Sequence, residues 1–272
     1  MFGSKSPDRA LSRFIIIVMA GAVCVTAPAG TARAIINGKD STESYPFMAS
    51  LEISPPGRGL GDEVCGGSLI HPQWVVTAAH CLNAEAGSIP EGTVRIGSDH
   101  RQSGGTVREI VKEVIHPRFT PGVPNTDDIG LIRLDRPVSY KPIPIAEQPG
   151  PPGSLTRIIG FGTTVSSKNP ADWRMADRLQ ELDTRIGAAS ECAPGFAGKA
   201  RLCTVSRVPD AMACNGDSGS PQMQRGRDGR WELIGATSGP GAPSPSCETG
   251  PGLYVNVPAY ADWIHATIRK YG

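Results

Sequence analysis

Short apolar runs separated by glycine and proline limit most strongly what this 272-residue chain can fold into. The chain has 33 glycines and 25 prolines, whereas charged residues make up only 19% of it. Such frequent turn residues argue against long helices, and apolar runs of about four to eight residues are typical of strands. We therefore expect an all-β protein, either a barrel or a sandwich. The expected strands include Gly67–Ile70, Trp74–Val76, Val107–Ile115, Ile129–Leu134, Leu155–Ile159, Trp231–Ile234 and Leu253–Val257.

One proline-rich segment divides the strand-forming sequence into two halves of similar size. Residues 141–154 contain five prolines in fourteen positions, and proline cannot donate a hydrogen bond to a strand ladder. We interpret this segment as a crossing linker between residues 35–140 and residues 155–272. Only Pro258–Tyr271 has apolar residues at helical spacing, so one helix is expected at the C-terminal end.

The first 34 residues have the three parts of a secretory signal peptide. Basic residues precede Phe14–Val25, an apolar run of twelve residues, and small residues follow it. Twelve residues are fewer than the roughly 20 that span a bilayer, so we expect no membrane anchor. Two A-x-A sites are open to signal peptidase: cleavage after Ala34 exposes Ile35, and cleavage after Ala29 leaves a short propeptide, residues 30–34. In both cases the mature protein is predicted to be secreted.

The net charge and the cysteines limit which partners, disulfides and metal sites can be expected. The 27 basic and 26 acidic residues give a net charge of +1, which offers no electrostatic reason to expect nucleic acid as a partner. An even number of cysteines in an exported chain predicts disulfides, although spacing alone does not select their pairing. No Cys or His cluster has zinc spacing, so neither a metal nor a cofactor is expected. The cysteines that follow the leader are Cys65, Cys81, Cys192, Cys203, Cys214 and Cys247.

Three short strings carry residue types suited to nucleophilic catalysis. His80 lies in VVTAAHC, Asp128 begins DIGLIRL, and Ser218 lies in CNGDSGSP. A serine hydroxyl is a weak nucleophile, so a base must take its proton as it attacks an acyl carbon. A neutral imidazole can accept that proton, and a carboxylate can hold the second ring nitrogen as a donor. The remaining histidines are interpreted as packing or surface residues: His71, His100, His116 and His265.

In this order, His80, Asp128 and Ser218 resemble the catalytic residues of the trypsin/chymotrypsin family of serine proteases. The resemblance covers the whole chain after the leader, because further landmarks fall in the family's order. The resemblance implies two antiparallel β-barrels packed side by side, with the catalytic residues between them and a C-terminal helix. It also implies a secreted serine endopeptidase that forms an acyl-enzyme intermediate, with protein or peptide substrates and protein protease inhibitors as partners. The landmarks are Ile35–Gly38, Cys65–Leu69, Gly160–Gly162 and Pro251–Tyr254.

The resemblance implies a role for each residue of the catalytic set. Ser218 is the expected nucleophile, His80 the general base, and Asp128 the residue that orients the imidazole. The N–H groups of Gly216 and Ser218 are expected to form the oxyanion hole. Gly216 suits this role because it lets the backbone turn tightly.

The resemblance also implies an activation device and a cysteine pairing. Asp217 is expected to form an ion pair with the free α-amino group of Ile35. A buried carboxylate without a partner is expensive, so formation of this pair can switch the oxyanion loop into shape. The implied disulfides are Cys65–Cys81, Cys192–Cys203 and Cys214–Cys247.

Two acidic features of trypsins are missing from this chain. Trypsins have an acidic residue six positions before the serine, but Met212 occupies that position. Asp210 lies two residues further back and is out of register with Cys214. The loop Gly97–Gly105 holds Asp99 as its only carboxylate, so the family's calcium loop is not expected here.

The strand that would pair with substrate also differs from the family. It is usually Ser-Trp-Gly but reads Ser238-Gly239-Pro240 here. Gly239 removes the aromatic wall, and Pro240 has no N–H for an extended substrate. Gly252 keeps another wall of the pocket low. A pocket formed by Met212, Ser238, Pro240 and Gly252 therefore predicts cleavage after apolar residues rather than after Lys or Arg.

Two other classes of protein fit the sequence less well. A protease-like binding protein that has lost catalysis predicts a substituted triad or oxyanion loop, and neither is found. An esterase of the α/β-hydrolase type needs the order Ser, Asp, His. Here the order is His, Asp, Ser, although Gly216–Ser220 superficially resembles the G-x-S-x-G turn of that fold.

Overall fold

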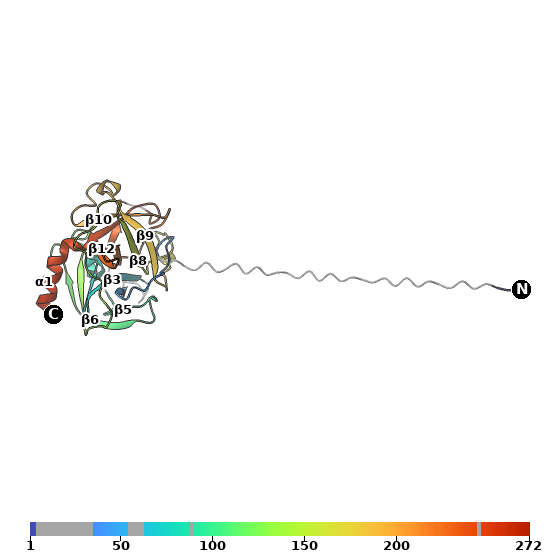
Figure 1. The fold of residues 1–272 in the computed structure, drawn as a ribbon, viewed down its shortest axis with the longest axis horizontal. Coiled ribbons are helices and arrows are strands. Elements are labelled where there is room, and N and C mark those ends of the chain that lie inside the picture. The colour runs from blue at the N-terminus through green and yellow to red at the C-terminus, as the bar shows by residue number, and fades with distance from the viewer. Residues whose placement is uncertain (4–34, 54–62, 87–89, 244–245) are drawn as a thin grey trace. The chain divides into compact units, whose positions relative to one another are not determined.

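The computed structural model describes residues 1–3, 35–53, 63–86, 90–243 and 246–272. The chain divides into two compact units, Met1–Thr31 and Ala32–Gly272, and the architecture below belongs to the second. The predicted signal peptide and its two cleavage sites lie outside the described residues. Figure 1 shows that strands dominate the ribbon and that the helix α1 (Ala261–Tyr271) lies at its C-terminal end.

Antiparallel strands close the first β-barrel. Their order is β2-β3-β4-β7-β6-β5, and β5 pairs back onto β2. All four side chains of β4 are buried, whereas β6 alternates partly buried with exposed side chains, as a strand with one solvent-facing side does. The bounds are β2 (Met48–Ile53), β3 (Glu63–His71), β4 (Trp74–Thr77), β5 (Thr93–Ile96), β6 (Thr106–Ile115) and β7 (Gly130–Leu134).

A second closed barrel follows in the sequence, with the strand order β8-β9-β10-β13-β12-β11 and β11 pairing back onto β8. The short strand β1 (Lys39–Asp40) extends this sheet beside β9, so the start of the folded unit reaches the second barrel. The two antiparallel barrels confirm the fold class predicted from the sequence. The bounds are β8 (Leu155–Gly160), β9 (Gln180–Ile186), β10 (Arg201–Ser206), β11 (Pro221–Arg225), β12 (Trp231–Pro240) and β13 (Gly252–Asn256).

The C-terminal helix forms at the predicted place but begins later than Pro258. Val257–Tyr260 form a 3₁₀ turn, η5, and α1 starts at Ala261. The helix packs on the first barrel, because the Lys112 ammonium in β6 lies 4.3 Å from the centroid of the Tyr271 ring. The last helix of the chain therefore lies against the first barrel, although it follows the strands of the second. The other 3₁₀ turns are η1 (Ala79–Leu82), η2 (Ala84–Ala86), η3 (Pro170–Asp172) and η4 (Ala189–Glu191).

The proline-rich segment 141–154 connects β7 to β8 and contacts both barrels. The Ile143 N–H donates to the Leu69 carbonyl in β3 (2.9 Å), and the Ala146 N–H donates to the Leu233 carbonyl in β12 (3.0 Å). These bonds satisfy backbone groups that a buried ladder would otherwise pair. An apolar cluster also continues from the first barrel into the second. It includes Trp74, Leu131, Phe161, Leu233 and Val255.

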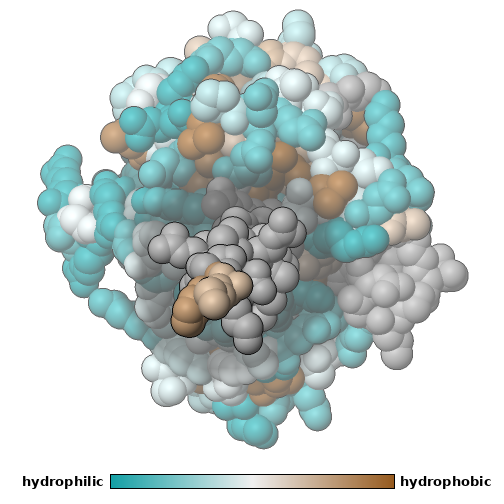
Figure 2. Space-filling model, turned by 90° about the vertical axis from the view of Figure 1, so that its right-hand side faces the viewer, coloured by the Kyte–Doolittle hydropathy of each residue, from teal (hydrophilic) through white to brown (hydrophobic). Residues whose placement is uncertain are grey.

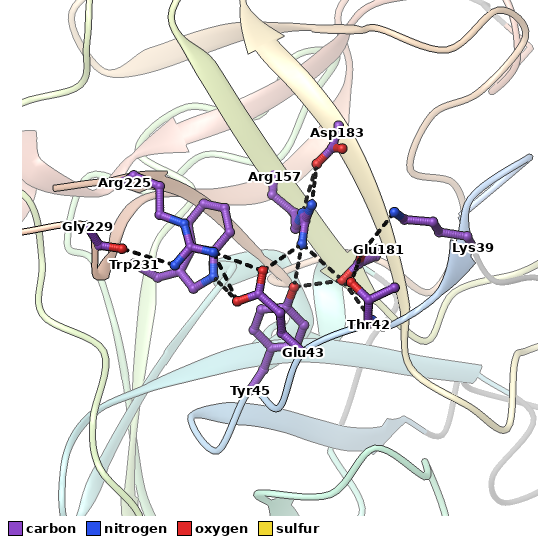
Figure 3. Close-up of polar contacts among 10 residues, drawn as sticks. All are labelled: Lys39, Thr42, Glu43, Tyr45, Arg157, Glu181, Asp183, Arg225, Gly229 and Trp231. Carbon is purple, nitrogen blue, oxygen red and sulfur yellow. Dashed lines mark hydrogen bonds and ion pairs between the residues drawn. The ribbon is translucent and has the colours of Figure 1, made fainter.

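Residues 39–45 are attached to the second barrel by a network of charges (Figure 3). Its centre is Glu181 in β9, whose side chain is fully buried. The carboxylate accepts hydrogen bonds from the Tyr45 hydroxyl (2.7 Å) and the Thr42 hydroxyl (2.8 Å). It also lies 3.2 Å from the Arg157 guanidinium. Burial opposes ionisation of Glu181, but these donors and Arg157 outweigh it and hold its pKa below the usual range.

Glu43 forms a second carboxylate centre in the same network (Figure 3). It accepts hydrogen bonds from Arg157 (3.1 Å), Arg225 (2.8 Å) and the indole N–H of Trp231 (3.0 Å). The Arg225 guanidinium also lies over the Trp231 ring, 3.7 Å from its centroid. Arg157 thus bridges Glu43 and Glu181, and the segment that precedes β2 is tied to β8, β9, β11 and β12.

The surface in Figure 2 is mainly hydrophilic, and its hydrophobic residues form small separate patches. Single exposed apolar side chains of this kind are ordinary on protein surfaces. Examples among the described residues are Val107, Val111, Leu155 and Val208.

Replacing Glu181 by alanine should destabilise the protein by about 3 kcal/mol. The change leaves Arg157, whose side chain is only 13% exposed, without one of its buried partners. It also removes the acceptor of the Tyr45 hydroxyl. The measurement is urea unfolding followed by Trp fluorescence.

The matched control is Arg185→Ala, which breaks a partly exposed ion pair with Glu191 at the surface. Exposed pairs contribute under about 1 kcal/mol, so this variant should unfold close to wild type. Equal losses in the two variants would contradict the importance assigned to burial of Glu181.

Candidate active site

His80 and Asp128 meet as the sequence predicted. His80 lies in η1, directly after β4, and the Cys65–Cys81 disulfide anchors this turn to β3. The His80 Nδ1 lies 2.8 Å from the Asp128 Oδ2, and the His80 backbone N–H donates to Oδ1 (2.9 Å). Because an ionised carboxylate only accepts, Nδ1 carries the proton, and Nε2 of the neutral ring is left as the basic nitrogen.

Asp128 is buried and receives further side-chain donors. The Ser238 hydroxyl donates to Oδ2 (2.6 Å), and so does the side-chain amide of Asn125 (3.1 Å). Burial opposes ionisation, but the neighbouring His80 and the hydrogen bonds from His80 and Ser238 outweigh it, so the pKa of Asp128 lies below its usual range. The carboxylate is therefore charged at neutral pH.

The turn before β7 aims Asp128 at the histidine. Asp127 has φ +43°, a left-handed conformation that is uncommon for residues other than glycine. Its carboxylate accepts hydrogen bonds from the Tyr260 hydroxyl (3.0 Å) and from Arg118 (3.1 Å). The ring of His116 packs edge-on against Tyr260 and is buried. These contacts hold the turn from the side of the C-terminal helix, and His116 has the packing role that the sequence predicted.

The loop that carries Ser218 is anchored from both barrels. The Gly66 N–H in β3 donates to the Ser218 carbonyl (2.7 Å), and the Gly219 N–H donates to the Thr237 carbonyl in β12 (2.8 Å). Gly216 and Gly219 have φ +89° and +77°, which glycine adopts without strain. A Cβ at Gly219 would also lie 2.4 Å from the Gly66 carbonyl oxygen. Glycine is therefore required on both sides of the serine.

Asp217 is buried beneath this loop. Its carboxylate accepts hydrogen bonds from the backbone N–H groups of Gly162 and Cys214, both at 2.9 Å. Burial raises its pKa to about 7 despite these two donors. A Cβ at Gly162 would lie 2.5 Å from the carboxylate, which explains why the string Gly160–Gly162 needs its glycine there.

Ile35 is buried, and its backbone nitrogen is uncharged. Its side chain packs in an apolar cluster with Met212 and Tyr254, and Ile36 pairs with Met212 through a backbone hydrogen bond of 3.0 Å. The chain continues through Ala34, so the nitrogen of Ile35 is a peptide nitrogen. The ion pair between Ile35 and Asp217 therefore stays a prediction about a shorter chain.

A cavity of about 520 Å³ opens beside Ser218. The predicted pocket residues Met212, Pro240 and Gly252 line it. A Cβ at Gly252 would lie 2.9 Å from the Tyr254 ring and 3.2 Å from the Met212 sulfur, so a side chain there would crowd two residues that line the cavity. Ser238, also predicted to line the pocket, directs its hydroxyl to Asp128 instead. Its neighbours Thr237, Gly239 and Pro240 in β12 line the cavity, whereas Ser238 does not.

Sequence reasoning missed several residues of the site. Lys168 and Trp173 line the cavity from the loop between β8 and β9, and Glu248 lines it from the segment before β13. Glu248 follows Cys247 directly, so the disulfide to Cys214 was an available signal. Asn125 beside Asp128 gave no recognisable signal, because its contact depends on the path of its loop. Asp210 is exposed and is not among the residues that line the cavity, in agreement with its register.

The cysteine pairing agrees with the one that the resemblance implied. The disulfides are Cys65–Cys81, Cys192–Cys203 and Cys214–Cys247. Within the described ranges, no cluster of three or more His, Cys, Asp or Glu residues could hold a metal ion. No helix in those same ranges is long and apolar enough to cross a membrane.

Comparisons with known proteins agree with this geometry. The family model described as Trypsin matches residues 35–264. The chain is 31% identical to Serine protease 7 of Drosophila melanogaster, over 86% of this chain and 65% of that relative. It therefore spans about 65% of the length of the curated relative that it matches. Among solved structures, it is similar to neuropsin, a serine protease expressed in the limbic system of mouse brain.

The likeness to neuropsin has a TM-score of 0.70 at 28% identity and covers 86% of this chain and 100% of that one. The family match, the relative and the fold point in the same direction and confirm the resemblance found in the sequence. The chain belongs to the trypsin family of serine proteases.

Proposed function

We propose that this chain is a serine endopeptidase and that Ser218, His80 and Asp128 carry its chemistry. The observation that supports it most directly is the hydrogen bond between His80 Nδ1 and Asp128 (2.8 Å), which leaves Nε2 as a base. A binding protein that had lost catalysis would not need a buried, ionised carboxylate behind the histidine. Burying that charge lowers the stability of the fold, so its presence is best explained by a role in catalysis.

In the proposed reaction, the Ser218 Oγ attacks the scissile carbonyl carbon while His80 Nε2 takes its proton. The N–H groups of Gly216 and Ser218 donate to the oxyanion of the tetrahedral intermediate. The intermediate collapses as the imidazolium protonates the leaving amine, and an acyl-enzyme remains. Water then attacks the ester by the same route, and Ser218 is regenerated. Asp128 stabilises the imidazolium without taking its proton.

Secretion is part of the same proposal. The leader 1–34 has the composition of a signal peptide, and three disulfides suit an oxidising compartment. The expected substrates are proteins or peptides, and protein protease inhibitors are expected partners. Neither a membrane anchor nor nucleic acid has a place in this proposal.

Specificity is proposed to favour apolar residues before the scissile bond. Met212 lines the cavity where trypsins have a carboxylate, and a thioether cannot neutralise a buried cation. Gly239 leaves space on the wall, because a Cβ there would meet no atom within 4 Å. Glu248 also lines the cavity and is the acidic group that would oppose this preference.

Ser218→Ala should abolish both peptide hydrolysis and labelling by a fluorophosphonate probe, because the nucleophile is lost. Asp128→Asn should lower kcat by about 10⁴-fold, because an amide at this position holds the imidazole in the tautomer that cannot act as the base. The same change has an effect of this size in the Ser-His-Asp triad. Labelling is read by mass spectrometry of the modified peptide. Full activity in Ser218→Ala would end the protease proposal.

For a chain that begins at Ala34, the free energy of unfolding should fall as the pH rises from about 4 to about 7. For a chain that begins at Ile35, it should fall less. In the longer chain the pKa of Asp217 is raised to about 7, whereas an unfolded Asp titrates near about 4. The folded state therefore holds a proton that the unfolded state releases, and stability falls as the pH rises through this window. A free Ile35 ammonium would instead favour the ionised carboxylate.

The measurement is urea unfolding of both chains at several pH values, together with their peptidase activity. Asp217→Asn in the longer chain is the control, because it removes the titrating group and should flatten the extra pH dependence. The longer chain should also be poorly active. Identical pH profiles and equal activity in the two chains would refute the ion-pair switch.

Peptide anilides ending in Phe or Leu should be cleaved at least about tenfold faster than the same anilide ending in Arg, as judged by kcat/KM. An unpaired cation beside Met212 costs more than the 1.4 kcal/mol that corresponds to tenfold. Met212→Asp should shift the preference toward Arg. If wild type prefers Arg and Glu248→Gln removes that preference, Glu248 sets the specificity and the apolar assignment is wrong.

A further inference from the structure

Asn125 contacts the carboxylate of the proposed triad from a loop that the sequence motifs do not include. The Oδ2 of Asp128 accepts from His80 Nδ1 (2.8 Å) and from the Ser238 hydroxyl (2.6 Å). The side-chain amide of Asn125 is a third donor to that oxygen, at 3.1 Å. The same amide nitrogen lies 3.4 Å from His80 Nδ1. Because both of these nitrogens carry hydrogens, this second contact is not a hydrogen bond, and the amide donates to Asp128 alone.

The orientation of this amide is determined by its other contacts. The Gly122 N–H donates to the Asn125 Oδ1 (2.9 Å), which places the NH₂ group on the side of Asp128. The Asn125 carbonyl accepts from Arg201 in β10 (2.8 Å), and Arg201 also donates to the Gly195 carbonyl (2.8 Å). The second barrel thus holds the backbone of Asn125 while its own loop holds the side chain. An amide constrained at both ends loses little further freedom when it binds the carboxylate.

We propose that Asn125 is a positioning residue of the triad, which restrains the Asp128 carboxylate and shares its charge. This inference rests on the proposed function. If Asn125 served only to close its loop, its Oδ1 would accept the loop hydrogen bond from Gly122, and its NH₂ group would point to solvent. Here the NH₂ group is directed to the oxygen that holds His80. By taking part of the charge on Oδ2, Asn125 lowers the stabilisation that Asp128 gives to the imidazolium.

The other charged groups near this site face elsewhere. Asp127 is directed toward Arg118 and the Tyr260 hydroxyl, and His116 lies behind it, 3.9 Å from its carboxylate. Burial lowers the pKa of His116 below its usual range, which favours the neutral ring. Arg118 is directed to Asp127, and Arg201 donates to the Asn125 and Gly195 carbonyls. Asp128 is therefore the charged group that the Asn125 amide contacts directly.

The test replaces Asn125 by leucine, which has a similar volume, excludes water and donates no hydrogen bond. Kinetics are measured on a tripeptide anilide and on an ester of a single N-acetylated amino acid. We expect kcat to fall about fivefold on both substrates with little change in KM, because the lost contact is to Asp128 and not to substrate. The lower of the two pKa values in the pH dependence of kcat/KM should rise by about half a unit. Without the Asn125 donor, the Asp128 carboxylate stabilises the imidazolium more strongly.

The control is Thr126→Ala in the same loop, an exposed position whose loss should change neither kcat nor the pH profile. Asn125→Ala is the second variant and carries the test if the leucine variant does not fold. If wild type fails to cleave either substrate, the proposed function fails first. If wild type cleaves the substrates and both Asn125 variants have the same kcat and the same lower pKa of kcat/KM as wild type, the positioning role is wrong. A loss confined to KM on the tripeptide would make Asn125 a substrate contact and overturn the inference.

Discussion

The buried carboxylate of Asp128 is the constraint on which the rest of the site depends. Its donors come from both barrels: His80 follows β4 of the first, and Ser238 lies in β12 of the second. A charged group with 1% of its surface exposed is costly unless these donors are all in place. The two barrels must therefore keep one relative arrangement for the carboxylate to remain ionised. Catalytic geometry and barrel packing are maintained by the same hydrogen bonds.

Further contacts between the barrels reinforce that arrangement at different places. The Gly66 N–H in β3 donates to the carbonyl of Ser218, so the first barrel helps to place the proposed nucleophile although its loop belongs to the second. On another side, Arg157 and Glu181 tie the segment before β2 to the second barrel (Figure 3). The helix α1 returns to β6 through Lys112 and Tyr271. The first barrel is therefore contacted by the second half of the chain in several regions.

Asp217 differs from Asp128 in having no charged partner among the residues that the structure describes. Both carboxylates are buried, yet the pKa of Asp128 is lowered and that of Asp217 is raised to about 7. The difference arises because His80 and the Ser238 hydroxyl donate to Asp128, whereas the donors to Asp217 among the described residues are the N–H groups of Gly162 and Cys214. The loop beside Ser218 thus contains a group whose ionisation depends on a partner that a new N-terminus could supply.

The sequence by itself determined the fold class and the family and predicted the catalytic roles of His80, Asp128 and Ser218, because short strands and spaced motifs are local signals. It could not place Ser238 behind Asp128, Glu248 at the cavity or Asn125 against the carboxylate. Those positions depend on how β12 and the connecting loops pass one another after the barrels pack. Only the tertiary structure decided them, since a hydrogen bond between Ser238 and Asp128 joins residues 110 positions apart that no local pattern relates.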